Sequence, residues 1–461
     1  MADRSVQDSQ ESDDIYALDA ETVDAIVSAA TSGEREELLL LLEPLHPADV
    51  ADLLEQVKAS ERADIVLLWG EDFNSDVLTE VEEKVRDDLI EHLPETVLNQ
   101  AVQELDADDV VYLVEDLDQP EQDRILDTLD DADRAAVLAS LQFPEDSAGR
   151  MMQRDFVMSP THWTVGDAID HMRASDDLPA QFYDIVITDP RMRPVGTVAL
   201  SQVMAHSRET RLATLMDEDF RTIPATQSRE DVGYAFSQYH LVSAPVVDED
   251  NRLVGIITID DAVEAMEEGS HEDMMHLAGV GAEEELSDNV WTTAKQRFPW
   301  LFANLVTAIL ASVVISFFAA TIEAIVALAI LMPIVASMGG NGGTQSMTVA
   351  VRAIATRDLT AANAWRIVWR EGLVGLLNGI AFAVIIGSVG MIWYGAPMLG
   401  VVLGIALVGT MLVAGLSGVL IPMWLERLGI DPALASGAFV TTVTDVVGFL
   451  AFLGLASALL L

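Results

Sequence analysis

The C-terminal third of the chain is apolar and carries no net charge. Residues 296–461 contain six acidic and six basic residues, and a helix of about 20 apolar residues is long enough to cross a bilayer. Five such runs occur, near 300–320, 325–351, 373–394, 398–424 and 434–460. Because these runs are apolar on every face, they do not fit the amphipathic helices of a soluble core. The sequence therefore predicts a five-helix, all-α transmembrane domain over 295–461, embedded in a lipid bilayer.

The basic residues of this domain predict its orientation. Lys295 and Arg297 precede the first span, and Arg427 lies between the fourth and the fifth. The loop between the second and third spans holds four more arginines: Arg352, Arg357, Arg366 and Arg370. Cytoplasmic loops are enriched in Lys and Arg, and the two remaining loops contain neither. We expect a multi-pass protein of the cell (inner) membrane with its N-terminus in the cytoplasm and its C-terminus outside.

The acidic residues are concentrated in the rest of the chain. Of the 75 Asp and Glu residues, 69 lie in residues 1–295, together with 19 of the 25 Lys and Arg residues. Such a charge repels a phosphate backbone and excludes nucleic acid as a partner. The absence of Cys excludes disulfides and thiolate metal sites. Residues 1–19 lack an apolar core, so we expect an acidic disordered tail there and not a signal peptide.

Residues 20–148 have a helical pattern with a weak internal repeat. The segments LHPADVADLLEQV and LDADDVVYLVEDL, which begin at residues 45 and 105, are related at an offset of 60. Each carries Asp near the expected helix start, where the positive end of the helix dipole favours it. We expect a superhelical domain built from pairs of short helices over 20–148, a type of domain that is typical of interaction modules.

A second repeat follows. MMQRDF at 151–156 resembles LMDEDF at 215–220, and each copy continues as helix, strand, turn, strand and helix. The two copies resemble a tandem pair of α/β CBS domains, with units at 149–210 and 211–266. In the second copy, GIITIDD matches the segment with which many CBS units contact nucleotides, and Thr258 and Asp261 suit ribose hydroxyls. The resemblance therefore implies that the pair could bind ATP.

Two features inside the predicted spans are unusual for simple membrane anchors. The second span contains Pro333 and four glycines near Asn341, which are costly in a helix interior. We expect this span to be broken and to line a watery path, with close helix packing through small residues as the alternative. The fifth span holds Asp445 near mid-membrane, where a carboxylate is costly unless it faces a cavity, a cation or a partner. A cation pathway is our interpretation, and a protonated structural Asp is the alternative.

The order of these parts resembles the MgtE family of magnesium transporters and channels. The glycine-asparagine run, RAIATRDL, LGIDPALASG and TTVTDVVGF carry the resemblance. It implies a multidomain chain with an α-helical N domain, a tandem CBS pair, a connecting plug helix over 267–294 and the five-helix transmembrane domain. It also implies a homodimer that conducts Mg²⁺ between its subunits into the cytoplasm, down the electrochemical gradient. Cytosolic Mg²⁺ would close this pathway. Mg²⁺ would then be both substrate and regulator.

The resemblance also implies the site residues. The pore ligands would be Asp445, Asn341 and Thr441. The regulatory carboxylates would be Asp76, Asp108, Glu230, Asp261, Glu264, Glu272, Asp273 and Asp431. The sequence departs from the family pattern at Ser228, Gly269 and Gly437, where the family has other polar or acidic residues.

Other interpretations of the sequence stay open. Oxygen-only ligands would also take Co²⁺ or Mn²⁺, although they favour harder ions. A membrane-anchored CBS sensor without transport would need neither Asp445 nor the glycine run. An enzyme is a third possibility, but the spans contain no Ser, His and Asp grouping. Carboxylate-rich surfaces are also typical of proteins from a high-salt cytoplasm, which would explain the acidity without any sensing role.

Overall fold

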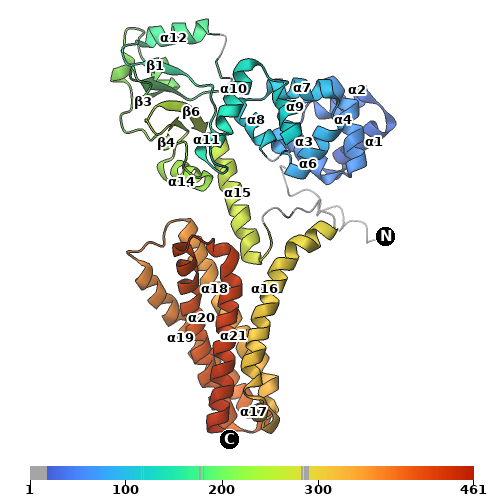
Figure 1. The fold of residues 1–461 in the computed structure, drawn as a ribbon, viewed down its shortest axis with the longest axis vertical. Helices are drawn as coiled ribbons and strands as arrows, with labels where there is room; N and C mark the ends of the chain where they lie inside the picture. The colour runs from blue at the N-terminus through green and yellow to red at the C-terminus, as the bar shows by residue number, and fades with distance from the viewer. Residues whose placement is uncertain are drawn as a thin grey trace, which may run out of the picture. The chain divides into compact units, whose positions relative to one another are not determined.

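The computed structural model describes residues 18–115, 117, 119–175, 178–179, 181–281, 284 and 290–461. The chain divides into two compact units, residues 1–266 and 267–461 (Figure 1). The first unit contains helices and two three-stranded sheets, and the described part of the second is helical. The expected multidomain fold class is confirmed. The tail expected over 1–19 lies outside the described residues, apart from Leu18 and Asp19.

The first unit begins with a stack of short helices. Asp19 starts the first helix by accepting a hydrogen bond from the Thr22 amide at 2.6 Å, as expected of an N-cap carboxylate. The helices are α1 (Ala20–Ser32), α2 (Arg35–Leu42), α3 (Pro47–Gln56), α4 (Ala59–Trp69), α5 (Val77–Glu80), α6 (Glu83–His92), α7 (Glu95–Glu104), α8 (Ala107–Val114), α9 (Gln119–Leu126) and α10 (Asp131–Ser140). One buried apolar cluster runs through them. The starts of α3 and α8 are 60 residues apart, which matches the repeat in the sequence.

Two sheets of identical topology complete this unit. The strands are β1 (Met158–Pro160), β2 (Asp184–Thr188), β3 (Pro194–Ala199), β4 (Ile223–Pro224), β5 (Ser243–Val247) and β6 (Leu253–Thr258). In each sheet the first strand pairs parallel with the second, which pairs antiparallel with the third. The helices beside them are α11 (Ala148–Met151), α12 (Val165–Ala174), α13 (Leu200–Ala205) and α14 (Arg229–Tyr239). In both hairpins an Asp, Asp189 or Asp248, accepts backbone hydrogen bonds within the turn. The internal repeat is thus present in the structure.

The next helix, α15 (Ile259–Ala278), continues without interruption across the expected start of the plug at residue 267. The last helix of the second repeat and the first part of the plug are therefore one helix. Of the remaining plug residues, 282, 283 and 285–289 lie outside the described part of the chain. Glu284 forms an ion pair with Arg297 at the start of the following helix.

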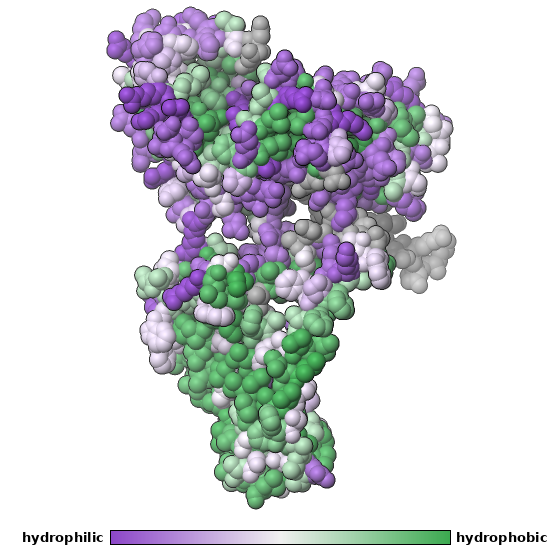
Figure 2. Space-filling view, in the orientation of Figure 1, coloured by the Kyte–Doolittle hydropathy of each residue, from purple (hydrophilic) through white to green (hydrophobic). Residues whose placement is uncertain are grey.

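Five helices of the second unit are long and apolar enough to cross a membrane. They are α16 (Val290–Ser316), α18 (Ala327–Ala355), α19 (Ala364–Tyr394), α20 (Pro397–Arg427) and α21 (Pro432–Leu459), and the short α17 (Ala319–Ala324) lies between the first two. Figure 2 shows the hydrophobic surface that these helices present. The five predicted spans are confirmed, but α16 and α19 begin about ten residues earlier than the apolar runs do. Their first turns carry charged side chains, such as Lys295 in α16 and Arg370 in α19, which interrupt the apolar pattern but not the helix.

The expected break in the second span is wrong. α18 is a continuous helix that contains Pro333 and the glycine run. The glycines serve close packing, because a Cβ at Gly339 would lie 2.6 Å from Thr410 Cγ2 on α20, and one at Gly343 would lie 2.6 Å from Val440 Cγ1 on α21. Small residues at helix contacts are typical of membrane bundles. The alternative that the sequence left open, helix packing, therefore accounts for these two positions.

The contact between α19 and α20 gives a test of this packing. A Cβ at Gly375 would lie 2.3 Å from the Met411 carbonyl oxygen, so Gly375→Ala must push the two backbones apart. We expect a loss of about 1–3 kcal/mol of stability, measured as thermal unfolding of the detergent-solubilised chain. Gly390→Ala in the same helix is the control, because its nearest atom would lie at an ordinary 3.4 Å. Equal stability of the two variants would contradict this packing.

Candidate ion pathway and acidic sites

Asp445 lies in the middle of α21, thirteen residues after Pro432. α21 contains no Lys or Arg, and α18 and α20 carry their basic residues, Arg352 and Arg427, only in their last turns. The Asp445 side chain is half-buried in the single chain. A carboxylate at this depth, with no basic residue on its own helix and none outside the last turns of α18 and α20, needs water, a cation or a second polar group.

The neighbours of Asp445 on α21 form a polar face. Thr441 is one turn earlier, so the two side chains project from the same side of the helix, and Thr441 is exposed. Thr444 is buried and packs against α18, where Cβ atoms at Gly339 and Gly343 would lie 3.4 Å from its Cβ and 3.3 Å from its Cγ2. The packing through Thr444 fixes how far Asp445 and Thr441 lie from α18.

Asn341 does not contact this face within one chain. It lies two residues from Gly339 and two from Gly343, which take the side of α18 that meets α21. Residues two apart on a helix project about 200° from each other, so Asn341 lies on the opposite side, where it is exposed. Asp445 and Thr441 are thus brought together by the single chain, and Asn341 is not.

A second group of carboxylates lines a small cavity of about 50 Å³ in the first unit. Asp108 and Asp109 come from the first turn of α8, and Asp261 and Glu264 come from the first turns of α15. The cavity also contains Glu115, which lies 3.3 Å from Arg150 in an ion pair. Asp108 is only 7% exposed, and its Oδ1 has no hydrogen-bond partner among the described residues. Acidic side chains from α8 and α15, far apart in sequence, thus line one cavity, together with Arg150 and Arg229.

Burial and mutual repulsion raise the pKa values of these acids. The pKa of Asp109 rises to about 7, mainly by burial and then by the charges of Asp106 and Asp261. Burial also raises the pKa of Asp261 to about 6, although hydrogen bonds from Thr258 oppose the shift. The pKa of Asp108 lies well above its usual range for the same reasons, burial first and the charge of Asp261 second. At neutral pH the cavity therefore favours bound protons or a cation that offsets the negative charge.

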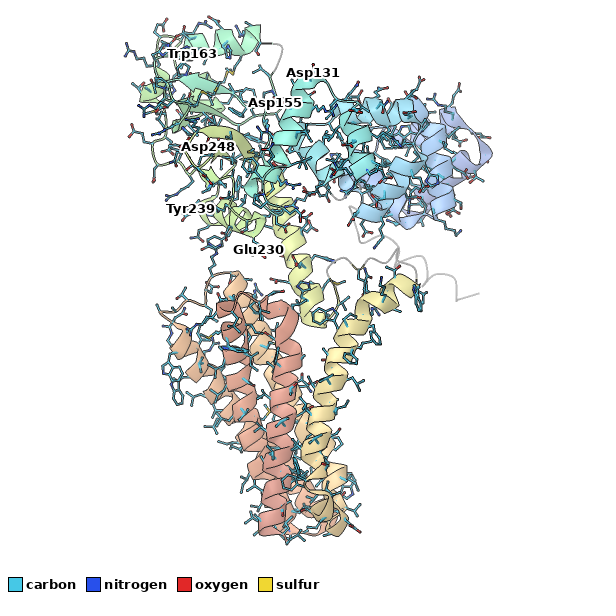
Figure 3. All side chains as sticks on the ribbon, in the orientation of Figure 1. Asp131, Asp155, Trp163, Glu230, Tyr239 and Asp248 are labelled. Carbon is cyan, nitrogen blue, oxygen red and sulfur yellow. The ribbon has the colours of Figure 1, made fainter. Side chains whose placement is uncertain are left out.

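Four of the five regulatory positions expected in this unit meet here. Asp108, Asp261 and Glu264 line the cavity, and the charge of Asp76 raises the pKa values of Asp106 and Asp109. Asp106 and Asp109 were not predicted as site residues, although both belong to the run DADD at the start of α8. The charge of Asp155, labelled in Figure 3, also raises the pKa of Asp106.

Glu230 is placed differently. It is exposed in the first turn of α14 and does not line the cavity (Figure 3). Ser228, one of the departures from the family pattern, caps this helix by accepting a hydrogen bond from the Asp231 amide at 3.3 Å.

Thr258 lies at the start of α15 beside the cavity and is almost fully buried. Its backbone amide and its hydroxyl both donate to Asp261, at 3.3 and 3.0 Å, and the hydroxyl also donates to Asp260. Thr258 and Asp261, the two residues expected to bind ribose hydroxyls, are therefore hydrogen-bonded to each other in this structure.

A third acidic group lies within the second unit. The Asp431 carboxylate caps α21, accepting hydrogen bonds from the Ala433 and Leu434 amides at 2.8 and 3.2 Å. Its Oδ2 also lies 2.8 Å from His276 Nδ1 near the end of α15. Glu272 Oε1 is 3.9 Å from the same nitrogen. Burial, followed by the charges of Asp431 and Glu272, raises the pKa of Asp273. The three expected carboxylates thus meet, together with a histidine that the sequence did not single out.

Within the described residues, no three His, Asp or Glu side chains are arranged to hold a metal ion by themselves. Mg²⁺ usually keeps several of its waters and binds through one or two carboxylates. Each acidic group of the single chain can therefore act on a hydrated cation, and a second chain could add further oxygens to it.

The raised pKa values give a prediction for pH dependence. An unfolded Asp ionises near pH 3.9, whereas folded Asp261 and Asp109 ionise near 6 and 7. Between these values the folded state holds more protons than the unfolded state, so the stability around the cavity falls as the pH rises. We expect hydrogen exchange of the α8 amides in metal-free buffer, corrected for intrinsic rates, to show less protection at about pH 8 than at about pH 5.

Asp109→Asn should flatten this dependence, because it removes a group that titrates in the range. Asp64→Asn, which removes an exposed carboxylate from α4, should leave it unchanged. Protection that rises with pH would contradict the assignment.

Comparisons with known proteins agree with this organisation. Three families match: the divalent cation transporter domain MgtE over residues 332–455, the MgtE intracellular N domain over 45–146, and the CBS domain over 212–268. The first of the two repeats is not part of the CBS match, in line with its degenerate sequence.

Relatives agree as well. A protein named magnesium transporter MgtE from Bacillus subtilis is 31% identical over 69% of this chain and 70% of its own. Its namesake from Thermus thermophilus is 34% identical over 70% and 72%. The crystal structure of the cytosolic domain of the Mg²⁺ channel MgtE in complex with ATP covers 52% of this chain and 99% of its own, with 28% identity and a TM-score of 0.49. On its family matches and these relatives, the chain belongs to the MgtE family of magnesium transporters and is a membrane protein.

Proposed function

We propose that the chain is a Mg²⁺-selective, channel-like transporter that moves Mg²⁺ into the cytoplasm down its electrochemical gradient. The observation that carries this proposal is Asp445, a carboxylate at the middle of a membrane helix that has no basic residue beside it. The membrane potential, negative inside, supplies about 2.3 kcal/mol per charge for each 100 mV. The basic residues at the ends of α18 and α20 support a cytoplasmic N-terminus and a C-terminus outside.

A homodimer fits this role. One carboxylate per chain is a poor site for a divalent ion, and two-fold symmetry would bring two Asp445 side chains to one point. Thr441 lies on the same face and can hydrogen-bond to the waters of the ion. Asn341 lies on the far side of α18 from its own α21, so in this arrangement it would meet the pathway through the partner chain or through water.

The test of the pathway is Mg²⁺ uptake into proteoliposomes. Asp445→Asn keeps the size of the side chain but removes its charge, so uptake should fall by about tenfold or more, the loss that follows from weakening the site by about 1.4 kcal/mol. Glu426→Gln is the matched control, because Glu426 is an exposed carboxylate near the end of α20. Wild-type uptake by Asp445→Asn would refute the pathway.

The same liposomes separate the remaining alternatives. Uptake of Co²⁺ or Mn²⁺ in preference to Mg²⁺ would indicate another divalent cation as the substrate. No uptake of any of these ions by the wild-type chain would favour a membrane-anchored sensor.

Closure by cytosolic Mg²⁺ is the second part of the proposal. Cations between the cavity carboxylates would offset the repulsion that raises their pKa values. α15 carries Asp261 and Glu264 near its start and Glu272, Asp273 and His276 near its end. A change at the cavity can therefore pass along one helix to the group at Asp431. Mg²⁺ shifts this equilibrium only by binding the closed state more tightly.

The test of closure is proteolysis of the full chain in saturating KCl. We expect Mg²⁺ at millimolar concentration to protect residues 105–115 and 259–278, because divalent ions bridge carboxylates that K⁺ only screens. Asp108→Asn combined with Asp261→Asn should abolish this protection, and Asp64→Asn should leave it intact. Full protection by KCl alone would refute a sensing role and leave salt adaptation as the explanation of the acidity.

ATP binding at Thr258 and Asp261 stays a prediction. Both residues would have to give up the hydrogen bonds that join them in this structure. Asp261 also faces the acidic cavity, so a nucleotide and a cation there would compete for, or share, the same carboxylate.

A further inference from the structure

Glu371 is a carboxylate inside the membrane unit that the proposed pathway does not use. It lies two turns after the start of α19 and is only 7% exposed. Its Oε2 accepts a hydrogen bond from the Ser346 hydroxyl of α18 at 2.9 Å, and Ser346 is 6% exposed. An ionisable side chain that is buried among packed helices is uncommon and costly, so its presence calls for a role.

Two glycines of α20 enclose this hydrogen bond. A Cβ at Gly415 would lie 2.4 Å from the Glu371 carbonyl oxygen, and a Cβ at Gly418 would lie 2.7 Å from Ser346 Cβ. α20 therefore approaches the backbones of α19 and α18 closely at this level, which buries both side chains. A hydrogen bond to a carboxylate in such an apolar setting is stronger than one in water, and an unmade one is correspondingly costly.

The bond is connected to the pathway through α18. Ser346 lies one turn after Gly343, and a Cβ at Gly343 would lie 2.6 Å from Val440 Cγ1 and 3.3 Å from Thr444 Cγ2 on α21. Thr444 directly precedes Asp445. A rotation or slide of α18 that broke the bond to Glu371 would therefore change the contact that holds Asp445 in place.

We propose that Glu371 is a positioning residue: through its hydrogen bond to Ser346 it fixes α18 against α21 and so sets the position of the Asp445 carboxylate. This inference rests on the proposed role of Asp445 in the ion pathway. Glu371 itself acts at a distance and does not touch the ion.

The experiment measures the Mg²⁺ concentration that gives half-maximal uptake by the full chain in proteoliposomes, corrected for the amount of folded protein. Ser346→Ala and Glu371→Leu each remove the bond, and each should raise this concentration about fivefold to tenfold. The double variant should be no worse than either single variant, because both remove the same interaction. Glu371→Gln keeps an acceptor for the Ser346 hydroxyl and should stay within about twofold of wild type.

Ser417→Ala is the matched control. Ser417 is a buried serine of α20 whose hydroxyl donates only to the Ala414 carbonyl oxygen of its own helix, at 3.3 Å, so its loss should leave half-maximal uptake unchanged. Variants that lower only the amount of folded chain, with unchanged half-maximal Mg²⁺, would reduce Glu371 to a structural role and overturn the inference. The inference would also be overturned if Glu371→Gln raised the half-maximal Mg²⁺ concentration as much as Glu371→Leu, while Ser346→Ala left it at the wild-type value.

Asp445→Asn, assayed in parallel, separates the two proposals. Normal uptake by that variant refutes the pathway itself. If Asp445→Asn loses uptake but Glu371→Leu has the wild-type half-maximal Mg²⁺ concentration, only the positioning role of Glu371 is refuted.

Discussion

Carboxylates held partly away from water, in excess over the basic groups near them, are the constraint on which this structure depends. In the membrane unit, Asp445 lies at the centre of α21, and the basic residues of the neighbouring helices α18 and α20 lie only at their ends. In the first unit, Asp108, Asp109 and Asp261 line a small cavity together with Arg150 and Arg229, and the charges of the three acids repel one another. Both arrangements are costly in the absence of a cation. Under the proposed function, a bound divalent cation offsets this cost at both sites.

Much of the fold could be predicted from composition and repeats. Five apolar runs indicate five spans, and two related copies indicate two similar sheets, because both signals are local. The start of α19 was not predictable in this way, since a hydropathy pattern marks the lipid-embedded part of a helix and not its polar first turns. That error placed Glu371 in a loop, when it is buried in the bundle. The glycines of α18 were also misread, because a glycine that breaks a helix and one that packs it against a neighbour look alike until the facing residue, such as Val440, is known.

The positions of the acidic groups were also only partly predictable from the sequence. Asp108 and Asp261 are 153 positions apart, and the family pattern indicated both, yet no spacing in the sequence shows that they line one cavity. Asp109 was missed because it is one of many acids in an acidic chain, and only its burial distinguishes it. His276 was missed for a different reason: its partner, Asp431, lies on another helix of the same unit. Glu230 resembles the others in sequence but is exposed outside the cavity.

The continuity of α15 limits where members of the family can gain or lose residues. Its twenty residues form one helix, with Asp261 near one end and Glu272 eleven residues later. Eleven residues make just over three whole turns, so the two side chains project in nearly the same direction. Inserting or deleting one residue between them would turn Glu272 and His276 by about 100° about the helix axis relative to Asp261. Natural insertions should therefore be excluded from this stretch, or occur in steps close to whole turns, while loops elsewhere remain free to change.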